Sequence, residues 1–268
     1  QGLDPSDDGG TSGHDDYIDA LNLLSNQDEY DINLILLPGI IDSVHSGICT
    51  KAINVCEERG DCFVVLDPVP WDTSNISTVT TEANTRNSSY ASMYWPWVEI
   101  SEWFAPAGLN RGQISNASQV ERVLTQSNRD DLYNSGVNPI VRFPNEGICV
   151  YGQKTLQKKA SALDRVNVRR LLIKLKKLIA STSRFLIFEQ NVASTRNEFL
   201  TIVNPYMEKI QSQSGLSAFR VVMDETNNTP DTIDRNILYG QLFLQPTRTA
   251  EFIILDFTIQ PTGAAFPE

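Results

Sequence analysis

The sequence predicts two domains of different class, an α/β domain with a βαβ unit over residues 1–100 and an α+β C-terminal domain over residues 101–268. In the first part, two short apolar runs flank a helix-length segment, the pattern of parallel strands joined by a crossover helix. Beyond the turn-forming stretch Gly108-Leu-Asn-Arg-Gly112, short strands and helices mix irregularly, which is typical of α+β domains.

The first part contains the more regular pattern. Residues 32–37 form an apolar run ended by Pro38-Gly39, and residues 62–66 form a second run ended by Asp67-Pro68, so each predicts a buried strand. A helix over residues 43–58 connects them and ends before Gly60. Residues 70–87 are rich in Thr, Ser and Asn and predict a loop, followed by a strand over residues 94–100.

The second part centres on one long amphipathic helix over residues 162–180. Ser161 and Asp164 have the spacing of a capping box at its start. Further helices are predicted over residues 118–126 and 195–213. Strands are predicted over residues 138–143, 147–151, 186–188 and 219–223, with an antiparallel pair formed by residues 238–244 and 251–258.

Charge is unevenly distributed along the chain. The formal net charge of −11 argues against nucleic acid as a partner, because phosphate binding needs a basic surface. Residues 1–50 contain ten acids and no Lys or Arg, whereas residues 154–177 contain nine bases and one acid. An acidic end and a basic middle can be complementary between copies of a chain, although two solvated surfaces would give the same pattern. No apolar run is long enough to predict insertion into a membrane.

Candidate chemistry is sparse. His45 and Cys49 lie four residues apart near Asp42 and could form a nucleophile–base pair or part of a metal site. However, Cys56 continues the same apolar helix face, so we interpret these cysteines, together with Cys62 and Cys149, as buried thiols. Their spacing matches no metal or disulfide framework and favours synthesis in a reducing cytoplasm. We therefore expect no enzymatic activity, metal or cofactor.

Two basic rows flank the apolar stripe of the long helix. The stripe predicts a core contact. Around it, the basic rows predict a solvated face, a membrane-surface face or a docking face for an acidic partner. One row comprises Arg170, Lys174 and Lys177, and the other comprises Arg165, Arg169 and Lys176.

Seven sequence blocks follow one another between residues 103 and 258. They are Trp103-Phe-Ala-Pro-Ala-Gly-Leu-Asn-Arg-Gly-Gln-Ile114, Gly136-Val-Asn-Pro-Ile140, Gly147-Ile-Cys-Val-Tyr-Gly-Gln-Lys-Thr155, Asp164-Arg-Val-Asn-Val-Arg-Arg-Leu171, Phe188-Glu-Gln-Asn191, Val221-Val-Met-Asp-Glu-Thr-Asn-Asn-Thr-Pro230 and Gln245-Pro-Thr-Arg-Thr-Ala-Glu-Phe252. In this order they resemble the contractile tail sheath proteins of phages and related injection systems. Residues 30–39 and 61–68 match the α/β middle domain of that family more loosely, so the chain resembles the C-terminal half of such a protein.

The resemblance implies a structural subunit of the virion tail, made in the host cytoplasm. Such a subunit forms a helical homo-oligomer around a tail tube protein, meets baseplate and tail terminator proteins, and contracts to drive the tube through an envelope. It implies no cofactor, no nucleic acid and no membrane insertion. The six bases of the two rows become candidates for a tube-facing surface, because sheath C-terminal domains lie innermost.

The resemblance also implies a linking arm at the C-terminus. In sheath proteins this arm adds a strand to a neighbouring subunit, and residues 251–259 are too apolar to remain an exposed strand edge. We expect residues 251–259 to close the domain's own sheet and the arm to begin near Gln260. The candidate arm residues are Phe257, Ile259, Gln260, Pro261 and Phe266.

Two other functions fit parts of the pattern. A soluble α/β enzyme would account for the βαβ unit, and it predicts a convergent polar pocket at the carboxyl ends of the strands. A cytosolic adaptor would use the basic helix on an acidic partner without polymerising. Electron microscopy separates all three functions, because only the sheath subunit predicts rings or tubes.

Overall fold

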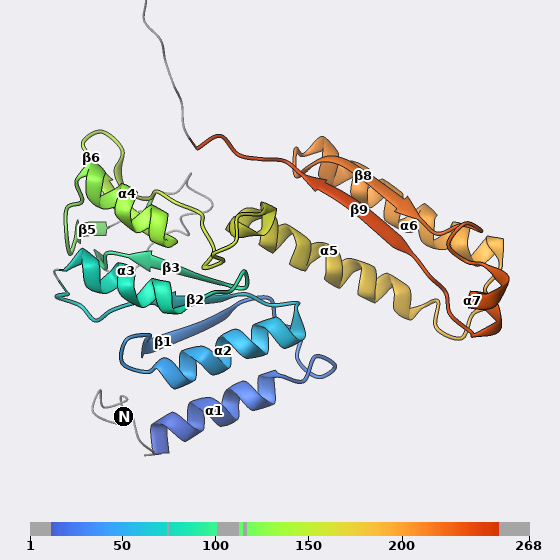
Figure 1. The fold of residues 1–268 in the computed structure, drawn as a ribbon, viewed down its shortest axis with the longest axis horizontal. Coiled ribbons are helices and arrows are strands. Elements are labelled where there is room, and N and C mark those ends of the chain that lie inside the picture. Colours follow the sequence, from blue (N-terminus) through green and yellow to red (C-terminus); the bar gives the residue numbers. More distant parts are fainter. Residues whose placement is uncertain (1–11, 74, 101–112, 115–116, 252–268) are drawn as a thin grey trace, which may run out of the picture.

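The N-terminal lobe is built on a five-stranded sheet (Figure 1). The computed structural model of the chain describes residues 12–73, 75–100, 113–114 and 117–251. We use "N-lobe" for the described residues up to 156 and "C-lobe" for residues 162–246. The strand order of the N-lobe sheet is β1-β2-β3-β6-β7, with the first four strands parallel and β7 antiparallel to β6.

The elements of the N-lobe sheet follow the apolar runs of the sequence. Its strands are β1 (Ile35–Ile41), β2 (Val64–Asp67), β3 (Ala91–Trp95), β6 (Val137–Phe143) and β7 (Gly147–Val150). A small antiparallel pair, β4 (Val98–Ile100) and β5 (Ala117–Val120), lies beside them. The helices are α1 (Ser12–Leu24), α2 (Ser46–Arg59), α3 (Ile76–Thr85) and α4 (Gln126–Ser135).

The predicted βαβ unit is confirmed as β1-α2-β2. One face of α2 is buried because Ile48, Ala52 and Val55 recur at helical spacing. The helix ends at Gly60, whose φ of 65° is the left-handed conformation that suits glycine at a helix C-terminus. The side chain of Trp95 is fully buried in the core of this lobe.

The C-lobe combines two long helices with a two-stranded sheet. Its elements are the 3-10 turn η2 (Ala162–Asp164), α5 (Val166–Arg184), α6 (Ala193–Ser212), β8 (Leu216–Val222), α7 (Pro230–Asp234) and β9 (Gln241–Pro246). Helix α6 packs against both α5 and β8, and β8 pairs with β9 in antiparallel register. The core of this lobe includes Leu175, Phe199, Val203, Met207 and Leu216. Figure 1 shows α5 reaching from the N-lobe to the end of the C-lobe where α7 lies.

The predicted fold class is confirmed, but the predicted boundary at residue 100 is wrong. Strand β6 pairs with β3, through Met93 with Val137 and Trp95 with Pro139, so the N-lobe sheet continues well past that position. Leu156 still belongs to the N-lobe core. The described polypeptide therefore changes lobe between Leu156 and α5, because β6 completes a parallel sheet that began a hundred residues earlier.

Three local predictions also differ from the structure, and a fourth falls largely outside the described residues. Residues 76–85 form helix α3 instead of a loop, and residues 118–126 hold β5 and the approach to α4 instead of a helix. Residues 186–188 form an exposed turn instead of a strand, with Phe188 at a φ of 72°. Strand β9 pairs with β8, and its predicted partner, residues 251–258, lies outside the described residues except for Glu251.

Candidate functional site at the root of the C-terminal segment

The loop after α1, most of whose residues are exposed, is organised by Arg59, at the end of α2. Its guanidinium donates hydrogen bonds to the carbonyl oxygens of Leu24, Asn26 and Tyr30. It also pairs with both carboxylate oxygens of Asp61, at 2.9 and 3.1 Å. Because Arg59 is almost fully buried, these bonds compensate the loss of water around its charge and fix the path of the loop.

This loop contacts the basic helix α5. Lys177 pairs with Asp31 and lies 3.9 Å from Asp61, and Arg184 lies 3.4 Å from Asp28. The hydrogen bond from Lys177 lowers the pKa of Asp31 below its usual value. The acidic end and the basic middle of the sequence therefore meet within one chain, at the junction of the two lobes.

Three further bases of the predicted rows also contact the N-lobe. Arg170 donates to the carbonyl oxygen of Asn33. Arg169 lies with its guanidinium carbon 4.1 Å from the centre of the Tyr90 ring, an attractive cation–π distance. Lys176 donates to the carbonyl oxygen of Arg59 at 3.3 Å.

Gly60, which follows α2, faces the end of the Lys176 side chain on α5. A Cβ atom on Gly60 would lie 2.5 Å from the Nζ atom of Lys176, in a backbone conformation that disfavours side chains. Of the six predicted tube-facing bases, Lys174 is exposed with no ion pair or hydrogen bond among the residues that the structure describes.

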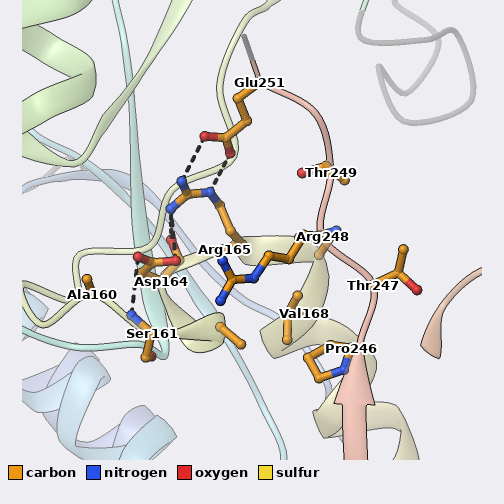
Figure 2. Close-up of a pocket in the computed structure, with 12 residues that line it drawn as sticks. Ala160, Ser161, Asp164, Arg165, Val168, Pro246, Thr247, Arg248, Thr249 and Glu251 are labelled. Atoms are coloured by element: carbon orange, nitrogen blue, oxygen red, sulfur yellow. Dashed lines mark hydrogen bonds and ion pairs between the residues drawn. The ribbon is translucent and has the colours of Figure 1, made fainter. Parts of the chain in front are cut away.

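The sixth base, Arg165, holds the root of the C-terminal segment (Figure 2). Its Nε and Nη2 atoms donate to the two carboxylate oxygens of Glu251, the latter at 2.7 Å. The hydroxyl of Tyr133 donates to the same carboxylate, and Asp164 pairs with Nη1 of Arg165 at 2.8 Å. We call Arg165, Glu251 and Tyr133 the clamp.

The electrostatics of the clamp favour an ionised carboxylate. Burial alone would raise the pKa of Glu251, but hydrogen bonds from Arg165 and Tyr133 outweigh it and hold that pKa below its usual value. Burial, together with the neighbouring Glu251, raises the pKa of the Tyr133 hydroxyl. Tyr133 is therefore a neutral donor and Glu251 a charged acceptor at neutral pH.

A polar cavity of about 390 Å³ opens beside the clamp. Figure 2 shows the start of α5 on one side and the chain that leaves β9 on the other. Besides Arg165 and Glu251, its walls include Asn167, Arg248 and Thr249.

The clamp joins residues from sequence blocks that are far apart. Arg165 and Glu251 belong to the fourth and seventh blocks, and Lys154, in the third, lies 3.9 Å from the Tyr133 ring centre. Asn138, in the second block, is buried and donates to the carbonyl oxygen of Lys154 at 2.8 Å. Sequence reasoning identified Arg165 but missed Glu251, which was considered only within the seventh block and as part of a strand, and Tyr133, which lies outside the seven blocks.

The buried polar residues of the N-lobe have a structural role. Asp42, at the carboxyl end of β1, has a fully buried side chain and accepts from Arg86 at 2.6 and 3.0 Å. His45 accepts the N–H of Ile41 at 3.1 Å, and burial raises the pKa of the Cys49 thiol, with Asp42 adding to the effect. A buried thiol with a raised pKa is a poor nucleophile and a poor metal ligand.

The predicted burial of Cys49, Cys56, Cys62 and Cys149 is confirmed. Across the described ranges, no three His, Cys, Asp or Glu side chains lie close enough together to bind a metal ion. In the same ranges, no helix has both the length and the apolar character needed to cross a bilayer. The candidate arm residues Phe257, Ile259, Gln260, Pro261 and Phe266 lie outside the described residues.

Curated relatives match more than half of the chain. The tail sheath protein of Vibrio phage KVP40 is 42% identical over 166 residues, and that of Enterobacteria phage T4 is 41% identical over the same length. Each match covers 62% of this chain and 25% of the relative, so the chain spans about a quarter of the length of these proteins.

Solved structures share the fold. A chain of the anti-feeding prophage baseplate superposes with a TM-score of 0.72 at 21% identity, covering 96% of this chain and 74% of that one. A chain of the sheath complex of an extracellular contractile injection system, PVC, in its contracted state gives 0.74 at 23% identity, covering 89% and 74%.

Family models match nearly the whole chain. The model for the phage tail sheath protein central domain matches residues 10–156, and the model for the phage tail sheath C-terminal domain matches residues 158–260. The boundary between the two family models, at residues 156–158, coincides with the passage of the chain from the N-lobe to α5. The chain therefore belongs to the phage tail sheath family.

Proposed function

We propose that this chain is part of the structural subunit of a contractile tail sheath. The subunit polymerises helically around a tail tube and shortens to drive the tube through a target envelope. The observation that carries the proposal is the consecutive match of a central and a C-terminal sheath domain over residues 10–260. The tail tube, baseplate and tail terminator are the proposed protein partners, in a virion tail whose subunits are made in the host cytoplasm.

We also propose that the subunit has no catalytic activity. The carboxyl ends of β1 and β2 are where an α/β enzyme would bind its substrate. Asp42, at that edge, is instead buried and paired with Arg86. Because Arg86 directly follows α3, this ion pair holds the end of α3 against the sheet.

Subunits are joined in this proposal by strand addition. Every second N–H of β9 points away from β8, as in any antiparallel pair. An apolar groove of about 420 Å³, lined by Leu172 and Ile179 of α5 and by Leu242 and Leu244 of β9, lies alongside that strand. We propose that the C-terminal segment of a neighbouring copy occupies this groove, since the apolar residues 252–259 suit it and main-chain bonds would fix their register. This proposal replaces the expectation that residues 251–259 close the sheet of their own subunit, because Arg165 holds Glu251 at the start of α5.

The tube-facing surface is proposed to include Lys174. Arg170 and Lys177 of the same row hold the N-lobe, which leaves Lys174 on the exposed side of α5. The exposed Lys209 on α6 provides a matched control. We expect Lys174→Glu to reduce the number of sheaths on tubes and Lys209→Glu to leave it unchanged, with equal circular dichroism. Equal sheath counts for both variants would exclude the tube contact.

The decisive experiment for the function is electron microscopy of the full-length subunit expressed with its tube protein. The expected result is rings or striated tubes of two lengths, extended and contracted. A second sample uses a subunit truncated after Glu251, which lacks the proposed linking residues 252–259 and should remain folded and form no sheath. A full-length subunit that stays monomeric at high concentration with tubes present would overturn the sheath function.

A further inference from the structure

The clamp holds the chain at the point where it leaves its own sheet. Strand β9 ends at Pro246, and the N–H of Thr247 donates to the carbonyl oxygen of Gly215 in the C-lobe. Two residues later, Gln153 of the N-lobe donates to the hydroxyl of Thr249 at 2.6 Å. The polypeptide therefore crosses from the C-lobe to the N-lobe within a few residues of the end of β9.

The crossing ends in the strongest polar contact of this region. Arg165 presents a planar fork to Glu251, the geometry that binds a carboxylate most specifically, and Asp164 holds the third nitrogen of that fork. Tyr133 adds a donor from α4, an N-lobe helix. The side chains of Arg165 and Glu251 are only 24% and 18% exposed, so water competes weakly for these bonds.

This path is incompatible with an early return to β9. To pair with its own strand, the chain must reverse direction soon after Pro246, as in a hairpin of a few residues. Thr249 is instead held by Gln153 of the N-lobe, and Glu251 by Arg165 and by Tyr133 of the N-lobe helix α4. A hairpin onto β9 would have to break the contact at Glu251 and the hydrogen bond at Thr249.

A subunit that exchanges strands needs such a constraint. A tethered segment reaches its own sheet at a high effective concentration, so pairing within one subunit competes strongly with pairing between subunits. The apolar residues 252–259 suit either sheet. We infer that the clamp commits the C-terminal segment to the sheet of a second copy of this chain, by preventing its return to β9 of its own subunit. This inference rests on the proposed strand addition and assigns a positioning role to Arg165, Glu251 and Tyr133.

The test compares Glu251→Gln with wild type in the full-length subunit. Glu251→Gln keeps the shape of the side chain and removes its charge, and Arg248→Gln, on the wall of the same cavity, is the matched control. We expect Glu251→Gln to slow sheath formation about tenfold, the effect of weakening one charge-assisted contact. In the unassembled subunit, β9 amide hydrogens should exchange more slowly in Glu251→Gln than in wild type, because the segment now covers its own strand. Arg248→Gln should change neither measurement.

Two further variants test whether an effect of Glu251→Gln comes from loss of the clamp or only from misfolding. Tyr133→Phe removes one donor and should change both measurements in the same direction by a smaller factor. The double variant Arg165→Glu with Glu251→Arg exchanges the two charges. It should assemble better than either single variant, because the ion pair can form again in reverse. Unchanged assembly and unchanged β9 exchange in both Glu251→Gln and Tyr133→Phe would overturn the inference.

A truncation after Glu251 removes residues 252–259 and keeps the clamp, and it separates this inference from the function on which it rests. If the truncated subunit fails to assemble while Glu251→Gln assembles normally, the linking segment is real and the positioning role of the clamp is wrong. If the truncated subunit assembles as well as wild type, strand addition fails and the inference fails with it.

Discussion

Replacing Arg86 by Met tests the most buried ion pair of the N-lobe. Arg86→Met keeps most of the side-chain volume but leaves the Asp42 carboxylate, which is fully buried, without its charged partner. Removing one partner of a buried pair typically costs about 3–5 kcal/mol, because the remaining charge stays in a site of low dielectric constant. Arg86 also donates to the hydroxyl of Thr50 at 2.6 Å, so that bond is lost as well.

The unfolding assay can isolate the N-lobe. Trp71, Trp95 and Trp97 lie in the N-lobe and the C-lobe contains no tryptophan, so fluorescence separates the unfolding of the N-lobe from that of the C-lobe. With a urea m value of about 2 kcal/mol/M, the expected loss moves the midpoint by roughly 1.5–2.5 M. Arg184→Met is the control, because its pair with Asp28 is 67% and 91% exposed and should contribute at most about 1 kcal/mol.

A double variant checks the physical reasoning. Asp42→Leu combined with Arg86→Met removes both charges and should recover much of the lost stability, since the cost lies in the unpaired carboxylate. A midpoint shift below about 0.5 M for Arg86→Met, at an unchanged m value, would refute the argument. It would mean that Asp42 reaches water or another partner once Arg86 is gone.

Three more predictions concern the other regions. Leu175→Ala should destabilise the C-lobe by about 2–5 kcal/mol, measured by circular dichroism, because it opens a cavity at the centre of that core. Cys49→Ser should lower stability by about 1–3 kcal/mol through an unpaired buried hydroxyl, and the wild-type thiol should react with Ellman's reagent only after unfolding. The pKa of Glu251 is depressed, so the stabilisation from the clamp is complete above the unfolded-state pKa, about 4.3, and is lost as pH falls through the lower folded-state value. Amide exchange at residues 247–251 should therefore accelerate in acid and not between pH 6 and 8.

Local pattern predicted the elements whose burial is periodic. The β1-α2-β2 unit, α5 and α6 all carry apolar residues at regular spacing and were predicted within a few residues. Helix α3 was missed because its Thr- and Ser-rich sequence resembles a loop, and only Val79 and Ala83, four residues apart, are buried. Helix α4 was not predicted, although its sequence carries two capping residues. Thr125 accepts the N–H of Asn128 at its start, and Gly136 has a φ of 90° at its end.

Long-range pairing could not be predicted in the same way. Strand β6 joins β3 through main-chain bonds between residues about forty positions apart, and no local pattern encodes that choice. The charge segregation of the sequence was compatible with complementary surfaces on different copies and with two solvated surfaces. The structure shows contacts between the two segments within one chain, such as that of Lys177 with Asp31. Five of the six predicted tube-facing bases are engaged within it, because a helix that bridges two lobes offers its charges to the nearer surface first.

Arg59 has a consequence that reaches beyond its own lobe. Its guanidinium sets the shape of the loop after α1, and that loop supplies Asp28, Asp31 and Asn33 to α5. The orientation of the two lobes therefore depends on Arg59, whose side chain is almost entirely buried inside the N-lobe. A substitution at Arg59 would destabilise the N-lobe, because Asp61 loses its partner, and it would also loosen the angle between the lobes. In a helical polymer a small angular freedom per subunit accumulates along its length.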